Sequence, residues 1–78
     1  MDEDVLLVDA SGLRCPLPVL KARKALKGVA VGFKIRVVST DPASPLDFKH
    51  FCSTKGHVLI SIDEGDEKFE FIIQKGPV

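Results

Sequence analysis

The sequence predicts an α+β two-layer sandwich with the order β-α-β-α-β-β, in which two helices cover one face of a four-stranded mixed sheet. Three observations lead to this fold class. Segments with strand-like alternation are separated by segments with helical spacing. Several strands alternate apolar and charged residues, so one sheet face should be solvated. The 78 residues, 45% apolar and 28% charged, fit one small globular domain spanning residues 1–78.

The first half of the chain predicts a strand, a helix and a second strand. Residues 5–10, which are apolar except for Asp9, predict a strand that ends at a turn-forming Ser-Gly pair. Residues 16–27 have helical spacing and are followed by Gly28, a residue type that commonly ends helices. Residues 33–40 alternate apolar with polar or basic side chains, which indicates a half-buried strand. The predicted buried stripe of the helix is Pro18, Val19, Ala22, Ala25 and Leu26.

The second half predicts another helix and a β-hairpin. Ser44-Pro45-Leu46-Asp47 resembles a capping box with proline at the first helical position, so a helix is expected from Ser44 to Lys55. Residues 57–63 and 68–74 are predicted strands joined by a polar turn. Right-handed crossovers place both helices on one face. The last strand then returns antiparallel between the second and the third, which gives the strand order 1-2-4-3.

Charge is unevenly distributed although the net charge is zero. Residues 1–13 hold four acids and no Lys or Arg, whereas residues 14–55 hold nine Lys or Arg and two acids. This basic middle segment either steers an anionic partner or RNA, or forms a solvated helix face. The acidic start differs from a signal peptide, no apolar run is long enough to span a membrane, and two cysteines are too few for a disulfide scaffold. We therefore expect a cytoplasmic protein without membrane association.

Cys15 is the most informative residue because it directly precedes Pro16-Leu17-Pro18 at the start of the first predicted helix. Prolines are tolerated in a first helical turn, and here Pro16 and Pro18 are expected to shape the turn around the cysteine. Cys15 should then be the N-cap residue, where the free N–H groups and the helix dipole favour the thiolate. Arg14 should act in the same direction. The alternative is that Cys15 is a small buried hydrophobe.

Two loops are expected to share one shallow surface. Cys15 follows the first predicted strand and residues 41–44 follow the second, and sites of open α/β sheets usually lie at these carboxyl ends. Asp9 should brace its loop by accepting N–H bonds, with direct participation near Cys15 as the alternative, and Asp41 should brace its own turn. No enclosed pocket is expected beside Cys15, because so small a domain has little interior to spare.

The first helix carries a candidate docking surface. Leu17 and Leu20 fall outside the predicted buried stripe and lie among basic residues, so this face either docks partner proteins or is simply solvated. The candidate docking residues are Leu17, Leu20, Lys21, Arg23, Lys24 and Lys27.

Other chemistry-bearing residues are expected to be structural. Cys52 falls with Phe48 and Phe51 on the buried side of the second helix, which favours a core role over a resolving or second carrier cysteine, and disfavours a disulfide with Cys15. The two cysteines and two histidines of the chain have no familiar zinc-ligand spacing, so we expect no metal and no cofactor.

The segment from Asp9 to Pro18, Asp-Ala-Ser-Gly-Leu-Arg-Cys-Pro-Leu-Pro, resembles the signature of the TusA (SirA/YhhP-like) family of sulfur-carrier proteins. A second match consists of Asp41-Pro42, Asp47, Phe51-Cys52 and Gly56-His57. Size and element order also agree, so the resemblance covers nearly the whole chain.

This resemblance implies that Cys15 carries sulfur as a persulfide, received from a cysteine desulfurase or a rhodanese-like donor and passed to an acceptor protein. Such carriers serve tRNA thiolation, molybdenum-cofactor metabolism or sulfur oxidation. The chain would then be a covalent relay component and not an enzyme with its own turnover. The residues expected to support Cys15 are Arg14, Pro16, Pro18, Asp9, Gly12 and Asp41.

The sequence is also compatible with two other functions. A regulatory or RNA-associated binding module would use the basic helix face, and its salt-sensitive tRNA binding would survive Cys15→Ser. A thiol redox sensor would show preferential peroxide oxidation of Cys15.

Overall fold

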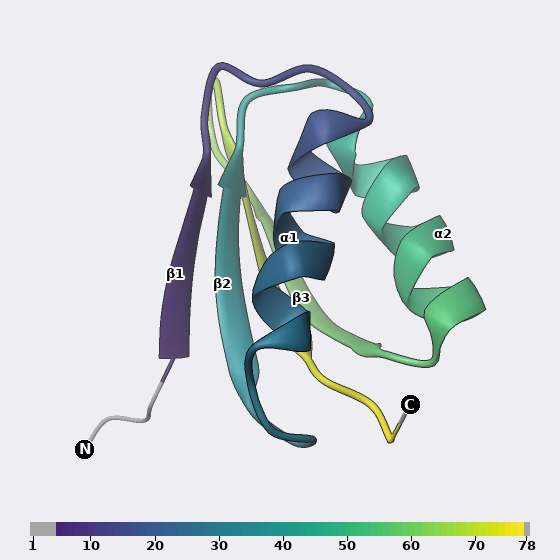
Figure 1. Cartoon of the computed structure of the whole chain (residues 1–78). Coiled ribbons are helices and arrows are strands. Elements are labelled where there is room, and N and C mark those ends of the chain that lie inside the picture. Colours follow the sequence, from purple (N-terminus) through teal and green to yellow (C-terminus); the bar gives the residue numbers. More distant parts are fainter. Residues whose placement is uncertain (1–4, 78) are drawn as a thin grey trace.

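The computed structural model describes residues 5–77 and confirms the predicted fold class. Its elements are β1 (Val5–Ala10), α1 (Leu17–Lys27), β2 (Lys34–Ser39), α2 (Ser44–Lys55), β3 (Val58–Glu64) and β4 (Phe69–Gln74). β1 and β2 are parallel, and β4 lies antiparallel between β2 and β3, so the order is β1-β2-β4-β3 as predicted. α1 and α2 lie side by side over one face of the sheet (Figure 1).

The core lies between the two helices and the sheet. Alternate residues of the central strands point toward the helices and are fully buried, and α2 adds Phe48, whose ring centroid lies 4.5 Å from that of Phe71. The predicted stripe of α1 also faces inward, with Pro18, Ala22 and Leu26 buried. Burial of this apolar surface is the main stabilising contribution, at about 25 cal/mol per Å². The buried residues of the central strands are Ile35, Val37, Ser39, Phe71 and Ile73.

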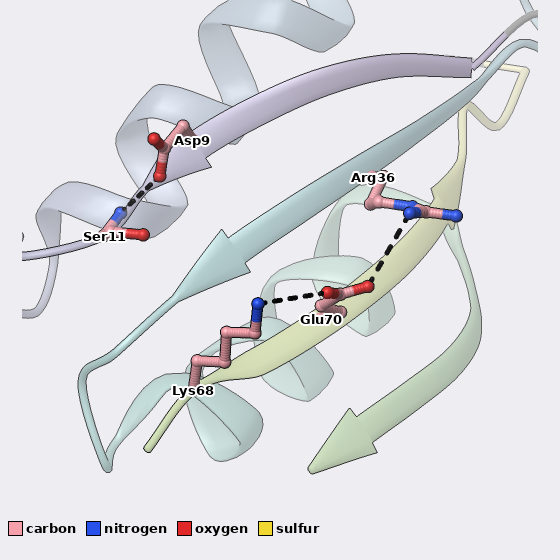
Figure 2. A network of polar contacts seen from close by, with 5 residues as sticks. All are labelled: Asp9, Ser11, Arg36, Lys68 and Glu70. Atoms are coloured by element: carbon pink, nitrogen blue, oxygen red, sulfur yellow. Dashed lines mark hydrogen bonds and ion pairs between the residues drawn. The ribbon is translucent and has the colours of Figure 1, made fainter. Parts of the chain in front are cut away.

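The opposite sheet face is solvated, as the alternation of the strands predicts. Arg36 of β2 and Glu70 of β4 approach to 3.8 Å across the two strands, and Lys68 lies 3.8 Å from the same carboxylate (Figure 2). Exposed ion pairs of this kind contribute little to stability. Their presence shows that this face of the sheet is in contact with solvent. Neither helix of the described residues is long and apolar enough to cross a membrane.

The start of α1 differs from the prediction. Pro16 is the N-cap residue, and its carbonyl accepts the first helical hydrogen bond from the Leu20 N–H at 3.1 Å. A separate turn, closed by the Leu17 N–H and the Arg14 carbonyl at 2.7 Å, precedes it. Cys15 therefore lies one residue before the N-cap, so the predicted N-cap position of this cysteine is wrong. Cys15 belongs instead to the tight turn between Arg14 and Leu17 that precedes the helix.

The start of α2 also corrects a prediction. Ala43 is the N-cap residue, no side chain caps the helix, and Ser44 already belongs to the first turn. The Ser44 hydroxyl is buried and shares a hydrogen bond with the hydroxyl of Ser39 at the end of β2. The predicted capping box is therefore wrong, because a buried tertiary partner engages the serine that would otherwise cap the helix.

α2 ends as predicted, at Gly56. This glycine has a φ of 79°, in the left-handed region that residues with a Cβ rarely adopt, and its N–H donates to the Cys52 carbonyl at 3.0 Å. Gly76 packs directly on this helix end, because a Cβ added there would meet the Gly56 carbonyl oxygen at 1.7 Å. The last described residues are thus tied to the end of α2.

Candidate functional site

The loops after β1 and β2 meet, as expected for parallel neighbouring strands. The Cys15 N–H donates to Asp41 Oδ2 at 2.9 Å, and the Gly12 N–H donates to Thr40 Oγ1 at 2.9 Å. The predicted bracing of its own turn by the Asp41 carboxylate is wrong, because that turn is closed by backbone groups of Ser44 and Asp41 at 3.0 Å. The carboxylate instead holds the loop that carries Cys15.

Asp9 braces the β1–α1 loop in the predicted way. Its Oδ1 accepts a hydrogen bond from the Ser11 N–H at 3.0 Å (Figure 2), and hydrogen bonds from Ser11 lower the pKa of the Asp9 carboxyl. Lys21 donates from Nζ to the Asp9 carbonyl, which ties α1 to the end of β1. Gly12, with a φ of 80°, makes the turn that follows.

Two half-buried carboxylates surround the exposed Cys15 thiol. Cys15 Sγ and one oxygen each of Asp41 and Asp47 all lie within 4.8 Å of one another. The pKa of Cys15 is raised, mainly by a hydrogen bond to Asp47, then by partial desolvation and by the negative charges of Asp47 and Asp41. The predicted preference for thiolate is therefore wrong. The cysteine is not at the helix N-cap, and the groups that act on its thiol are the carboxylates of Asp47 and Asp41.

Asp47 is the residue that sequence reasoning missed as part of the site. Its position in the first turn of a helix that follows the same loop as Asp41 is the signal that points to it, because the first turn of α2 lies at the same end of the sheet as Cys15. This mixture of one thiol with two carboxylates joins soft and hard donor types and gives no basis for assigning a metal.

An open groove of about 750 Å³ runs between α1 and α2 and begins at Cys15. Cys15 and Asp47 lie at one end, and Lys55 of α2 lines it further along. This groove is open to solvent, which agrees with the expectation that no enclosed pocket lies beside Cys15. Two helices packed side by side leave a groove that neither helix predicts alone. Its apolar lining includes Val19, Leu46 and Phe51.

The candidate docking residues lie outside the core. Leu17 and Leu20 are 48% and 47% exposed, and Lys24 is exposed beside them. Lys21 is exposed but already bonded to the β1 end. Arg23 and Lys27 line a second groove of about 350 Å³ that Lys55 and Lys75 also line. The structure thus leaves these side chains accessible, and their role in docking stays a prediction.

Cys52 is a core residue, as predicted. It is 3% exposed and burial raises the pKa of its thiol to about 11. It forms no disulfide with Cys15, which is also free. Of the two cysteines, only Cys15 is accessible to a partner protein.

The fold and the site define a small α+β protein that presents one accessible cysteine where two parallel strands end, on a surface open to a macromolecule. Residues 7–75 match the family described as sulfurtransferase TusA. The chain is 44% identical over 68 residues to the sulfur carrier protein TusA of Allochromatium vinosum, covering 87% of this chain and 90% of that protein. The chain therefore belongs to the TusA family, which confirms the resemblance read from the sequence.

Two further similarities support this assignment. A putative sulfur carrier protein of Neisseria meningitidis serogroup A is 43% identical over 67 residues, which cover 86% of this chain and 90% of the relative. The SirA-like protein from Desulfitobacterium hafniense has a crystal structure similar to this one, with a TM-score of 0.79 and 27% identity over 94% of this chain and 99% of that chain.

Proposed function

We propose that this protein is a cytoplasmic sulfur carrier that holds sulfane sulfur as a persulfide on Cys15. The observation that carries the proposal is the contrast between its two thiols: Cys15 is exposed at the mouth of a groove, and Cys52 is buried. Family membership and relatives named sulfur carrier proteins support it.

Charging proceeds by thiol exchange chemistry. The Cys15 thiolate attacks the terminal sulfur of a donor persulfide, a new bond forms between Cys15 Sγ and that sulfur, and the donor S–S bond breaks. The donor cysteine leaves as a thiolate and takes up the proton that Cys15 lost. Discharge repeats this exchange on a cysteine of the acceptor, so the relay needs no external oxidant or reductant.

The partners are a cysteine desulfurase or a rhodanese-like donor and a downstream acceptor protein, in tRNA 2-thiouridine formation or related sulfur trafficking. Exposed Leu17 and Leu20, with the basic residues of α1, form the docking surface. Reversing the charge of Lys24 should slow sulfur transfer from the donor several-fold without changing the fold. Unchanged transfer would remove this face from the docking surface.

The direct test is to incubate the protein with a cysteine desulfurase and cysteine and to measure its intact mass. Addition of one sulfur atom to the wild type and to Cys52→Ser, but not to Cys15→Ser, is the expected result. Absence of added sulfur on Cys15 with desulfurase and rhodanese-like donors alike would overturn the proposal.

The basic face of α1 also supports a second candidate, an RNA-associated module, because Arg23, Lys24 and Lys27 are exposed on one helix. Salt-sensitive tRNA binding that survives Cys15→Ser would favour it. A redox sensor is disfavoured, since peroxide reacts with thiolates and the carboxylates beside Cys15 favour its thiol form.

A further inference from the structure

We propose that Asp41 and Asp47 form an electrostatic gate that lowers the reactivity of Cys15 in the free protein, and that the sulfur donor opens this gate with a cationic side chain. The inference rests on the proposed carrier function and names a chemical requirement for its donor.

The β2–α2 loop and α2 each place one carboxylate beside the Cys15 sulfur. Asp41 reaches from the β2–α2 loop and is fixed by its 2.9 Å hydrogen bond from the Cys15 N–H. Asp47 stands on the first turn of α2 and lines the same groove end as Cys15. With all three groups within 4.8 Å, a negative charge on the sulfur is opposed from two sides.

Charged groups of the surrounding elements do not cancel this effect. α1 contributes uncharged Val19 to the groove beside Cys15. On α2, His50 is exposed, and Lys55 stands eight residues beyond Asp47, about 12 Å along a helix. Arg14 precedes Cys15 along the chain and is exposed to solvent, which screens its charge. The pKa of Cys15 is accordingly raised.

This arrangement conflicts with the first step of charging. The attack on a donor persulfide requires the Cys15 thiolate, and in the free protein its negative charge would add to those of two carboxylates. Both carboxylates are half-buried, so a docked partner can still reach them. A lysine or arginine beside the donor cysteine would pair with Asp47, remove the repulsion and favour the thiolate only within the complex. Arginine suits this role well, because its planar guanidinium binds a carboxylate through two hydrogen bonds.

The first test follows alkylation of the free protein with iodoacetamide as a function of pH, in a Cys52→Ala background. Asp47→Asn should move the profile to lower pH, whereas Asp47→Glu should keep it near the wild type. At neutral pH each unit of the shift should raise the rate about three- to fourfold, because a tenfold gain in thiolate is partly offset by lower nucleophilicity. Asp41→Asn, which keeps an oxygen for the Cys15 N–H, should shift it in the same direction by less.

The second test compares two sources of sulfur on the same variants. With glutathione persulfide as a small donor, Asp47→Asn should gain sulfur about threefold or more faster than the wild type, since no docked cation is needed. With a cysteine desulfurase and cysteine, the same variant should gain no advantage or lose rate, because the donor cation has lost its partner. A purely structural role for Asp47 would instead slow charging by both donors.

The outcomes separate the gate from the carrier function. An unchanged alkylation profile in both Asp47→Asn and Asp41→Asn would overturn the gate, and so would equal acceleration of Asp47→Asn by both donors. A shifted profile in a protein that accepts sulfur from neither donor would overturn the carrier function while leaving the electrostatic effect intact.

Discussion

Cys15 and Cys52 carry the same thiol in opposite surroundings. Both have a raised pKa, but carboxylates of Asp41 and Asp47 act on exposed Cys15, whereas burial acts on Cys52. The two thiols are therefore kept from reacting by different means, one electrostatic and one steric. A partner can neutralise a carboxylate on the surface, but only opening of the fold can expose the core thiol.

Exchange of each cysteine for serine should give the largest difference between the two thiols. Cys15→Ser should lose all charging by a cysteine desulfurase, while Cys52→Ser should retain charging, because only Cys15 is accessible. Intact mass spectrometry after incubation with cysteine reads out both variants. Comparable loss in the two variants would show that the core cysteine takes part in the relay.

Alkylation of the folded protein should show a large kinetic gap between the two thiols. Cys15 should react with iodoacetamide at pH 7.5 at least about a hundredfold faster than Cys52. The reagent can reach Cys52 only after local unfolding, which requires a free energy of several kcal/mol. Peptide mapping of a time course measures both rates in one sample. Similar rates would mean that α2 opens readily and that the contrast between core and surface is weak.

The buried cysteine should matter more than the exposed one for the stability of the fold. Cys52→Ser should lower the free energy of unfolding by about 1–3 kcal/mol, because it buries a hydroxyl in an apolar site, whereas Cys15→Ser should stay within about 0.5 kcal/mol. Urea denaturation followed by circular dichroism gives both values. Equal effects would contradict the placement of Cys52 in the core.

Alkaline pH offers a finer distinction. Burial raises the pKa of Cys52 from 9.0 to about 11, so its contribution to stability is present below pH 9 and is lost as the pH rises toward 11. At pH 10 the loss should be about 1.4 kcal/mol, and Cys52→Ala should lack this component. The difference in unfolding free energy between wild type and variant, measured at pH 8 and pH 10, tests it. A constant difference would mean that Cys52 titrates normally.

Most of the fold could be predicted because its signals are local. Every predicted element is present, and each boundary lies within one residue of the observed one. The strand Val5–Ala10 and the helix ending before Gly56 agree in full. Alternation, helical spacing and glycine stops depend on neighbours along the chain, so they can be read without coordinates.

The site was only partly predictable, because its electrostatics come from residues distant in sequence. The exposure of Cys15, the meeting of its loop with residues 41–44 and the bracing role of Asp9 were all predicted from the sequence. The N-cap position of Cys15, the capping role of Ser44 and the thiolate preference were wrong. In each case a tertiary partner or a tight turn outcompeted the local rule, as Ser39 does for Ser44.

Hydrophobic spacing along the chain was enough to predict the order of elements, the two-layer architecture and which cysteine is exposed, because that spacing decides which residues are buried. The charges that act on Cys15 could be identified only from the folded structure. The carboxylates of Asp41 and Asp47 lie 26 and 32 residues further along the chain, and the crossover from β1 to β2 brings them to within 4.8 Å of the sulfur. Charge effects depend on distance in space, which the fold alone sets.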